Sequence, residues 1–191
     1  MHAHAEVVVE DLDDPKDFEE VKAAVYGVIA SFCENDEDNH DTFYDWHQVG
    51  GRFTGSHDKF DPYSDPRNYE DCKWCNNTGF RTDAIGNSAR QENPSYTCDG
   101  CGHCNDDGTW THGKQGPGVK PKWPTDFAFH EGDVIRVEDC PDDLCCCTLV
   151  ADGDFFEMDE DSRSPKIETV KKKLTSLGIT TGWLVTVDYH F

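Results

Sequence analysis

The stretch that decides how this chain is organised runs from Cys72 to Cys104 and reads CKWCNNTGF at 72–80 and CDGCGHCNDDG at 98–108. Two Cys-x-x-Cys pairs can place four thiolates tetrahedrally around one Zn²⁺, each at about 2.3 Å from the metal. Such a site folds a small, loop-rich unit because the free energy of metal binding becomes folding free energy. We therefore expect one zinc ion in a module of its own.

Five cysteines lie in this stretch, so one of them is spare. In two of the Cys-x-x-Cys pairs a glycine follows the second cysteine four residues later, and glycine there lets backbone N–H groups turn toward the sulfur atoms. This shared spacing favours Cys72, Cys75, Cys101 and Cys104 as the zinc ligands, with Cys98 as the alternative ligand.

The segments on either side of the cysteines read as linkers. Residues 56–71 contain Asp61-Pro62 and Asp65-Pro66, and residues 109–124 are rich in glycine and proline, a composition typical of turns and connectors. We expect a zinc-binding insertion at 56–124 within one α+β domain formed by 1–55 and 125–191.

The rest of the chain alternates strand and helix patterns. Asp14 followed by Pro15 indicates a helix start, Ser164 and Pro165 indicate a second one, and Gly178 indicates its end. The order predicts a ferredoxin-like fold, an antiparallel sheet with two helices on one face. The expected strands are 6–10, one within 42–55, 134–138, a hairpin of 145–151 and 154–158 across Asp152-Gly153, and 183–191.

The net charge of the 191-residue chain is −22. Direct nucleic-acid binding is disfavoured because it needs clustered Lys and Arg to neutralise phosphates. Three interpretations of the acids remain open: a solvated surface, a surface that imitates phosphates to dock on a basic partner, and adaptation to high salt. We expect no signal peptide or membrane span, reduced thiols and a cytoplasmic protein.

The segment from Tyr44 to Gly55 is the best candidate for a binding site. Asp45, Trp46, His47 and Arg52 offer charge, aromatic surface and hydrogen-bonding groups within one short stretch. Alternatively, the aromatics seal the sheet. The glycines at 50, 51 and 55 indicate a bulge or a close approach of the backbone to another group.

Candidates for catalysis or for a second metal are weaker. Asp188 and His190 share one face of the last strand and, together with His47, could orient a proton transfer or touch a metal. The second cysteine cluster could bind another zinc or pack as small buried side chains; it comprises Cys140, Cys145, Cys146 and Cys147.

The two cysteine knuckles resemble the Cys-x-x-Cys-x-Gly-x-Gly repeats of the DnaJ-type zinc finger. Asparagine or aspartate replaces the first glycine, and there are two repeats where DnaJ chaperones have four. The resemblance implies one zinc ion and a role in protein contacts. The wider pattern, with the segment 44–52, Tyr63 to Arg67 and Val185 to His190, is also similar to uncharacterised proteins of actinobacteriophages.

These observations predict a zinc-stabilised, non-enzymatic interaction module, a phage accessory protein that binds or inhibits a host protein. One alternative is a small metal-dependent hydrolase or nuclease that uses His47, Asp188 and His190. The other is a structural component of the virion.

Overall fold

The computed structural model of the chain describes residues 1–34, 42–71, 83–93, 109–110, 113–114, 119–158 and 168–191. The chain divides into two compact units, Met1–Phe60 with Phe129–Phe191, and Asp61–Ala128. The boundaries expected from the sequence are 55/56 and 124/125. The first unit holds a six-stranded sheet, and the second holds short elements.

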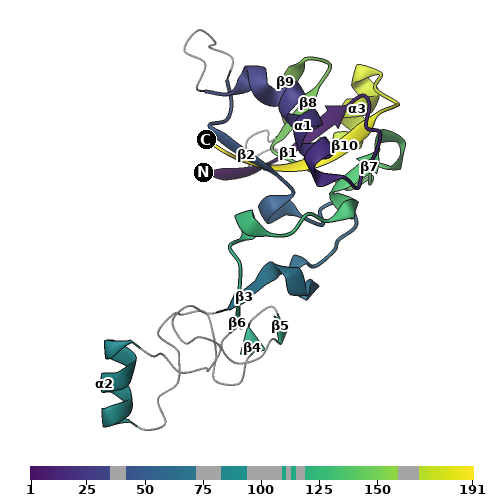
Figure 1. Ribbon diagram of the computed structural model, residues 1–191. Coiled ribbons are helices and arrows are strands. Elements are labelled where there is room, and N and C mark those ends of the chain that lie inside the picture. Colours follow the sequence, from purple (N-terminus) through teal and green to yellow (C-terminus); the bar gives the residue numbers. More distant parts are fainter. Residues whose placement is uncertain (35–41, 72–82, 94–108, 111–112, 115–118, 159–167) are drawn as a thin grey trace. The chain divides into compact units, whose positions relative to one another are not determined.

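The main sheet has the strand order β2-β10-β1-β8-β9, with β7 also beside β10 (Figure 1). Its long central strands, β1 and β10, are antiparallel, and β1 is parallel to β8. The sheet is therefore mixed. The strands are β1 (His2–Val9), β2 (Trp46–Val49), β7 (Val134–Arg136), β8 (Thr148–Ala151), β9 (Asp154–Glu157) and β10 (Trp183–His190).

Helix α1 (Phe18–Ile29) begins three residues later than the sequence predicts. Asp17 is its N-cap, and its side chain accepts hydrogen bonds from the N–H groups of Glu19 and Glu20. Asp14 instead accepts from Lys16 N in the preceding turn. The prediction of Asp14 as the cap is wrong. Both aspartates can accept a hydrogen bond from the N–H group two residues ahead, but the apolar stripe of the helix begins only at Phe18.

Helix α3 (Val170–Leu177) ends as predicted. Gly178 has a left-handed conformation with φ +75°, and its N–H bonds to the carbonyls of Leu174 and Thr175, as in a glycine-capped helix end. The observed N-cap is Thr169. The predicted start at Ser164 and Pro165 lies outside the described residues.

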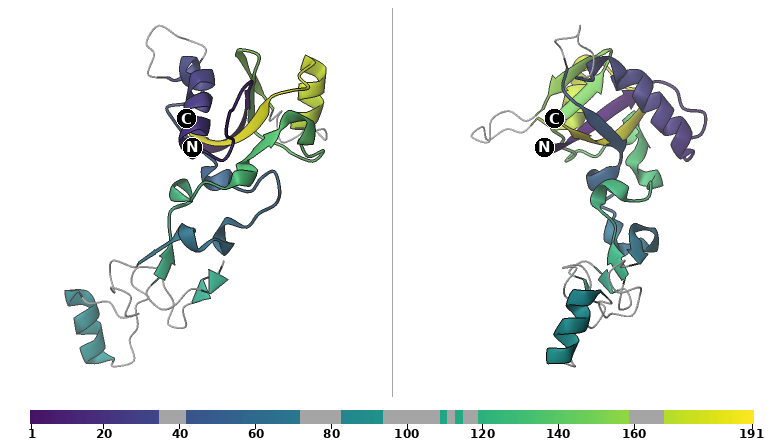
Figure 2. Two further views of the ribbon diagram at one scale, coloured as in Figure 1. Left: turned by 45° about the vertical axis from the view of Figure 1, so that its right-hand side comes forward. Right: turned by 60° about the vertical axis from the view of Figure 1, so that its left-hand side comes forward.

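Helices α1 and α3 lie on opposite faces of the sheet (Figure 2). The core under α1 contains the odd-numbered residues of β1, from Ala3 to Val9. The core under α3 contains Leu149 and Leu184, with Val8 packed against it. A run of three valines at 7–9 is apolar on both faces, so both faces require cover. The expected ferredoxin-like arrangement, with an antiparallel sheet and both helices on one face, is not confirmed.

The predicted hairpin is confirmed. Strands β8 and β9 pair antiparallel from Thr148 with Glu157 to Ala151 with Asp154. Asp152 and Gly153 both have positive φ, 54° and 74°. Two central residues with positive φ are typical of the tight turn that matches the strand twist of a hairpin.

The second unit contains helix α2 (Ala84–Glu92), which the sequence did not predict, and paired short strands. Strand β3 (Tyr69–Asp71) pairs with β6 (Val119–Pro121), and β4 (Thr109–Trp110) pairs with β5 (Gly113–Lys114). Asn68, which is fully buried, ties the unit together: its amide donates to Pro62 O at 2.8 Å and accepts from Ala128 N at 2.6 Å.

The predicted zinc ligands Cys72, Cys75, Cys101 and Cys104, and the alternative ligand Cys98, lie outside the described residues. Among the residues that the structure describes, no helix is long and apolar enough to cross a membrane.

Candidate functional site

One face of the sheet is unusually polar. Alternation along β1 places His2, His4 and Glu6 on the face opposite α1, and their register partners on β10 are His190, Asp188 and Thr186. Glu6, Thr186 and Asp188 are completely buried. Buried polar side chains need partners, and the chain supplies them from the segment that follows β2.

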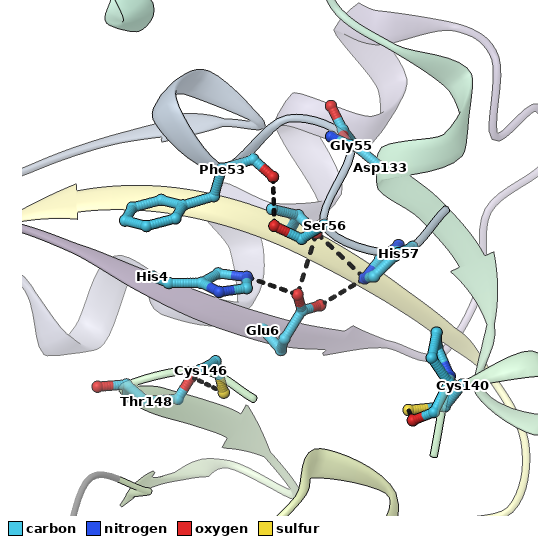
Figure 3. A network of polar contacts seen from close by, with 12 residues as sticks. His4, Glu6, Phe53, Gly55, Ser56, His57, Asp133, Cys140, Cys146 and Thr148 are labelled. Carbon is cyan, nitrogen blue, oxygen red and sulfur yellow. Dashed lines mark hydrogen bonds and ion pairs between the residues drawn. The ribbon is translucent and has the colours of Figure 1, made fainter. Parts of the chain in front are cut away.

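Glu6 lies between two imidazole rings (Figure 3). Its Oε1 is 2.7 Å from His4 Nε2, and its Oε2 is 2.9 Å from His57 Nε2. The hydroxyl of Thr186 donates to Oε1 at 3.0 Å. Phe53, from the 3₁₀ turn at Gly51–Phe53, stacks on the His4 ring at 4.8 Å. The carboxylate is thus fully enclosed.

Glu6 and His57 form an ion pair. Burial alone would raise the pKa of Glu6, but the charge of His57 and hydrogen bonds from both histidines outweigh it and hold the pKa at about 2. Burial lowers the pKa of His57, but the charge and hydrogen bond of Glu6, the carbonyl of Gly132 and the charge of Asp133 together raise it more, so the net shift is upward. His57 Nδ1 donates to Gly132 O at 3.0 Å, so both ring nitrogens are donors and the ring is an imidazolium.

The pH range of this pair follows from the two directions. Glu6, with a lowered pKa, stabilises the fold above its unfolded value of 4.5 and loses that contribution as pH falls toward 2. His57, with a raised pKa, stabilises below 6.5 and loses its contribution at higher pH. The pair is therefore most stabilising between pH 4.5 and pH 6.5.

Asp133 lies beside this network with one oxygen unpaired. Its Oδ1 accepts from Gly55 N at 2.6 Å, whereas its Oδ2 and the hydroxyl of Thr54 are buried and have no hydrogen-bond partner in the described part of the chain. Burial raises the pKa of Asp133 to about 6, although the Gly55 N–H, His130 and His57 act to lower it. This carboxyl is protonated in part near neutral pH.

The predicted residues Asp188, His190 and Asp45 do come together, at the ends of β1, β2 and β10. Asp188 Oδ1 is 2.9 Å from His2 Nδ1, and His190 Nδ1 is 2.8 Å from Asp45 Oδ1. Arg52 contributes its backbone N–H to Asp188 Oδ2 at 3.2 Å, while its side chain is exposed.

His47 does not join this group. Its register partner is Tyr189 of β10, which places its side chain on the α1 face, where it lies 6.2 Å from the ring of Tyr26. His47 and the pair Asp188 and His190 are therefore on opposite faces of the sheet. The three residues do not line one reaction centre.

A groove of 630 Å³ runs between α1 and β2. Its lining includes Tyr26, Trp46 and His47, with Lys22 and Glu19 joined by an ion pair of 2.7 Å at its rim. Burial lowers the pKa of His47, which leaves the ring neutral at pH 7. Tyr26 lies in the groove and is 59% exposed, whereas the side chain of Trp46, 38% exposed, lies on the other face of β2. The edge formed by β2 therefore presents uncharged aromatic surface to solvent on both of its faces.

The cysteine cluster at 140–147 is mainly packing. Cys140 and Cys146 are buried and Cys145 is exposed, and all are free thiols. Burial raises the pKa of Cys140 to about 11 and that of Cys146 well above its ordinary value, which suppresses thiolate formation. No group of three or more His, Cys, Asp or Glu side chains in the described residues is arranged to hold a metal. A second zinc ion at Cys140, Cys145 and Cys147 has no support from this geometry.

Comparison with known proteins gave no relatives. No family model, no curated protein and no solved structure matches the chain. The function is therefore inferred from the sequence and the geometry of this chain.

The sequence did not predict the Glu6 network. The one signal for it was a glutamate flanking a valine run in a strand, since an acid there must find a buried partner. Its partner, His57, is 51 residues away and sits in a segment read as a connector.

Proposed function

We propose that the chain is a zinc-stabilised, non-enzymatic interaction module, and that it binds an extended segment of a partner protein along β2. The observation that carries this proposal is the aromatic groove between α1 and β2. The sequence-based expectation of a phage accessory protein with a host partner is retained as part of the proposal.

The position of β2 supports an extended ligand. β2 is the last strand on its side of the sheet in the described residues, so one of its edges offers backbone N–H and C=O groups to another strand. Proteins use such edges to bind peptides by strand addition, where backbone hydrogen bonds give affinity and side-chain pockets give specificity.

Aromatic residues flank both faces of this edge. Trp46 contacts His2 on the polar face of the sheet, with ring centroids 5.7 Å apart. His47 and Tyr26 lie on the α1 face. An added strand would alternate its side chains between the two groups, and aromatic anchors of this kind contribute much of the affinity of interfaces.

The charge of the chain favours a basic segment. The net charge is −22, and opposite charge on the partner would speed association and set its orientation. Long-range attraction of this kind weakens with salt, whereas contacts with the aromatic groove do not.

The partner is identified by affinity capture from host lysate, with this chain as the bait, followed by mass spectrometry. Substitutions in the site then test where the partner binds. Tyr26→Ala and Trp46→Ala should each weaken binding of that partner by at least about tenfold. The matched control is Trp123→Ala, because Trp123 is 63% exposed and belongs to the other unit. Equal binding by all three variants would rule out the β2 edge, with its aromatic residues on either face, as the contact.

The zinc part of the proposal is tested by elemental analysis. We expect one Zn²⁺ per chain, lost on Cys75→Ser and retained on Cys145→Ser, a substitution at an exposed free thiol. Folded protein without zinc would contradict the proposed metal site while leaving the groove untested by that measurement.

A further inference from the structure

Two histidines at the ends of the central strands are each hydrogen-bonded to a carboxylate. His2 of β1 and His190 of β10 are register partners. Each directs its Nδ1 to a carboxylate, His2 to Asp188 at 2.9 Å and His190 to Asp45 at 2.8 Å. We propose that His2 and His190 together form a binding site for a divalent transition-metal ion such as Zn²⁺.

The carboxylates fix the chemistry of both rings. A carboxylate only accepts hydrogen bonds, so each Nδ1 must carry its proton, and the neutral ring then has its lone pair on Nε2. Neither Nε2 has a hydrogen-bond partner among the described residues. A histidine held by a carboxylate through one nitrogen and free at the other is the usual form of a metal-binding histidine.

The spacing of the rings suits one shared ion. The ring centroids of His2 and His190 are 5.3 Å apart, with the ring planes at 64°. Two imidazoles that bind one tetrahedral ion, each with a metal–nitrogen distance of about 2.1 Å, have centroids separated by about 5 Å. The separation of the rings is therefore compatible with one shared ion, which is bound once both Nε2 atoms turn toward it.

The site is open to solvent. The side chains of His2 and His190 are 23% and 41% exposed, whereas Asp188 is buried and already bonded through both oxygens. The N-terminal amine of Met1 is paired with the carbonyl of Phe191 and is no ligand in this arrangement. Two histidines supply two ligands, and water would fill the remaining positions, as at an exchangeable site.

This site differs in kind from the cysteine site expected at 72–104. Imidazole nitrogen ligands suit Zn²⁺, Cu²⁺ and Ni²⁺, and two of them bind more weakly than four thiolates. The two sites can therefore be filled in turn. The inference does not depend on the proposed binding of a partner at the groove.

The experiment uses the full chain, with no histidine tag and no added residues before Met1, after it has taken up its tightly held zinc. Zn²⁺ is then titrated while histidine nitrogens are followed by long-range ¹H–¹⁵N NMR. We expect the Nε2 resonances of His2 and His190 to shift together, while both Nδ1 atoms stay protonated.

Three variants separate a shared site from two independent histidines. In His2→Gln the zinc response of His190 should weaken at least tenfold, and in His190→Gln the response of His2 should do the same. Asp45→Asn should weaken zinc binding by about 10- to 100-fold by releasing the His190 ring. His47→Gln, on the other face of the sheet, should leave the zinc responses of His2 and His190 unchanged.

The proposal is overturned if neither Nε2 responds at millimolar Zn²⁺. It is equally overturned if each ring responds alone, with His190 binding zinc as well in His2→Gln as in the parent chain.

Discussion

At the scale of single residues, Gly50 shows how tightly the loop after β2 packs against Asp133. Its φ is +72°, and a Cβ atom added there would lie 2.6 Å from both Asp133 Oδ2 and Thr54 Oγ1. The prediction that glycines in this segment mark a close approach of the backbone is confirmed. Gly51 in the same loop approaches β10, because a Cβ atom added there would lie 2.7 Å from Asp188 Cβ.

Gly50→Ala should therefore destabilise the protein by about 3 kcal/mol, since a left-handed conformation and a steric clash add together. Gly153→Ala is the matched control: Gly153 has φ +74° with no atom within 4 Å of an added Cβ, so only the conformational cost of about 1 kcal/mol applies. Urea unfolding measures both. Equal losses would show that Gly50 has room for a side chain.

Asp133 gives a prediction with a definite sign in pH. Its folded pKa, about 6, is above the unfolded value of 3.8, so its contribution to stability is present below 3.8 and is lost as pH rises through 6. Asp133→Asn keeps an acceptor for Gly55 N and removes the buried charge. Relative to the parent chain, the variant should gain about 1 to 3 kcal/mol between pH 4 and pH 7.

Asp58→Asn is the control of opposite sign. Burial acts to raise the pKa of Asp58, but the hydrogen bond from His130 at 2.8 Å, the N–H of Phe60 and the charge of His130 together outweigh it and lower the pKa. The stabilising contribution of Asp58 is present at neutral pH and is lost on acidification. The free energy of unfolding of Asp58→Asn should therefore fall furthest below that of the parent chain at pH 7. Unfolding in urea across this range checks both; a pH-independent effect of Asp133→Asn would refute the assignment of a buried, titrating carboxyl.

At the scale of elements, local chemistry predicted the ends of elements better than their arrangement. Gly178 and the Asp152-Gly153 turn act within a few residues of themselves, and both are confirmed. Strand β1 extends to His2, beyond the expected start at Glu6, because β10 pairs with it along its whole length. No local signal specifies that pairing across 188 residues of separation.

The face of the sheet that α3 covers also depends on long-range contacts and not on local sequence. The periodicity of α3 indicated an apolar stripe but not the surface that receives it. The parallel pairing of β1 with β8 is likewise a long-range choice, since Ala5 and Thr148 meet only in the folded sheet. These choices depend on the sum of core contacts, which a pattern of single positions does not contain.

Some residues of the candidate site could be predicted from local sequence, and others could not. Asp188 and His190 could be predicted as neighbours because they are two residues apart on one expected strand, and Asp45, directly before β2, joins them through His190. His47 was assigned to the same group, although the strand period of two places it on the other face from Trp46. Glu6 and His57 were missed because their contact requires the loop at 50–57 to fold back over the sheet.

At the scale of the whole molecule, the first unit combines a rigid interior with an open edge. The enclosed ion pair of Glu6 and His57 joins β1 to the loop that follows β2. Removing one partner of such a buried pair is costly because the other charge remains. A rigid frame of this kind reduces the entropy cost of presenting β2 and the aromatic groove to a ligand.

The most direct test of this account is amide hydrogen exchange of the chain with and without its captured partner. If the partner adds a strand at β2, the exchange of amides at 46–49 should slow by at least tenfold in the complex, while β9, at the other edge of the sheet, should be unchanged. Unchanged exchange at β2, with protection only in the unit formed by Asp61–Ala128, would contradict the proposed binding edge.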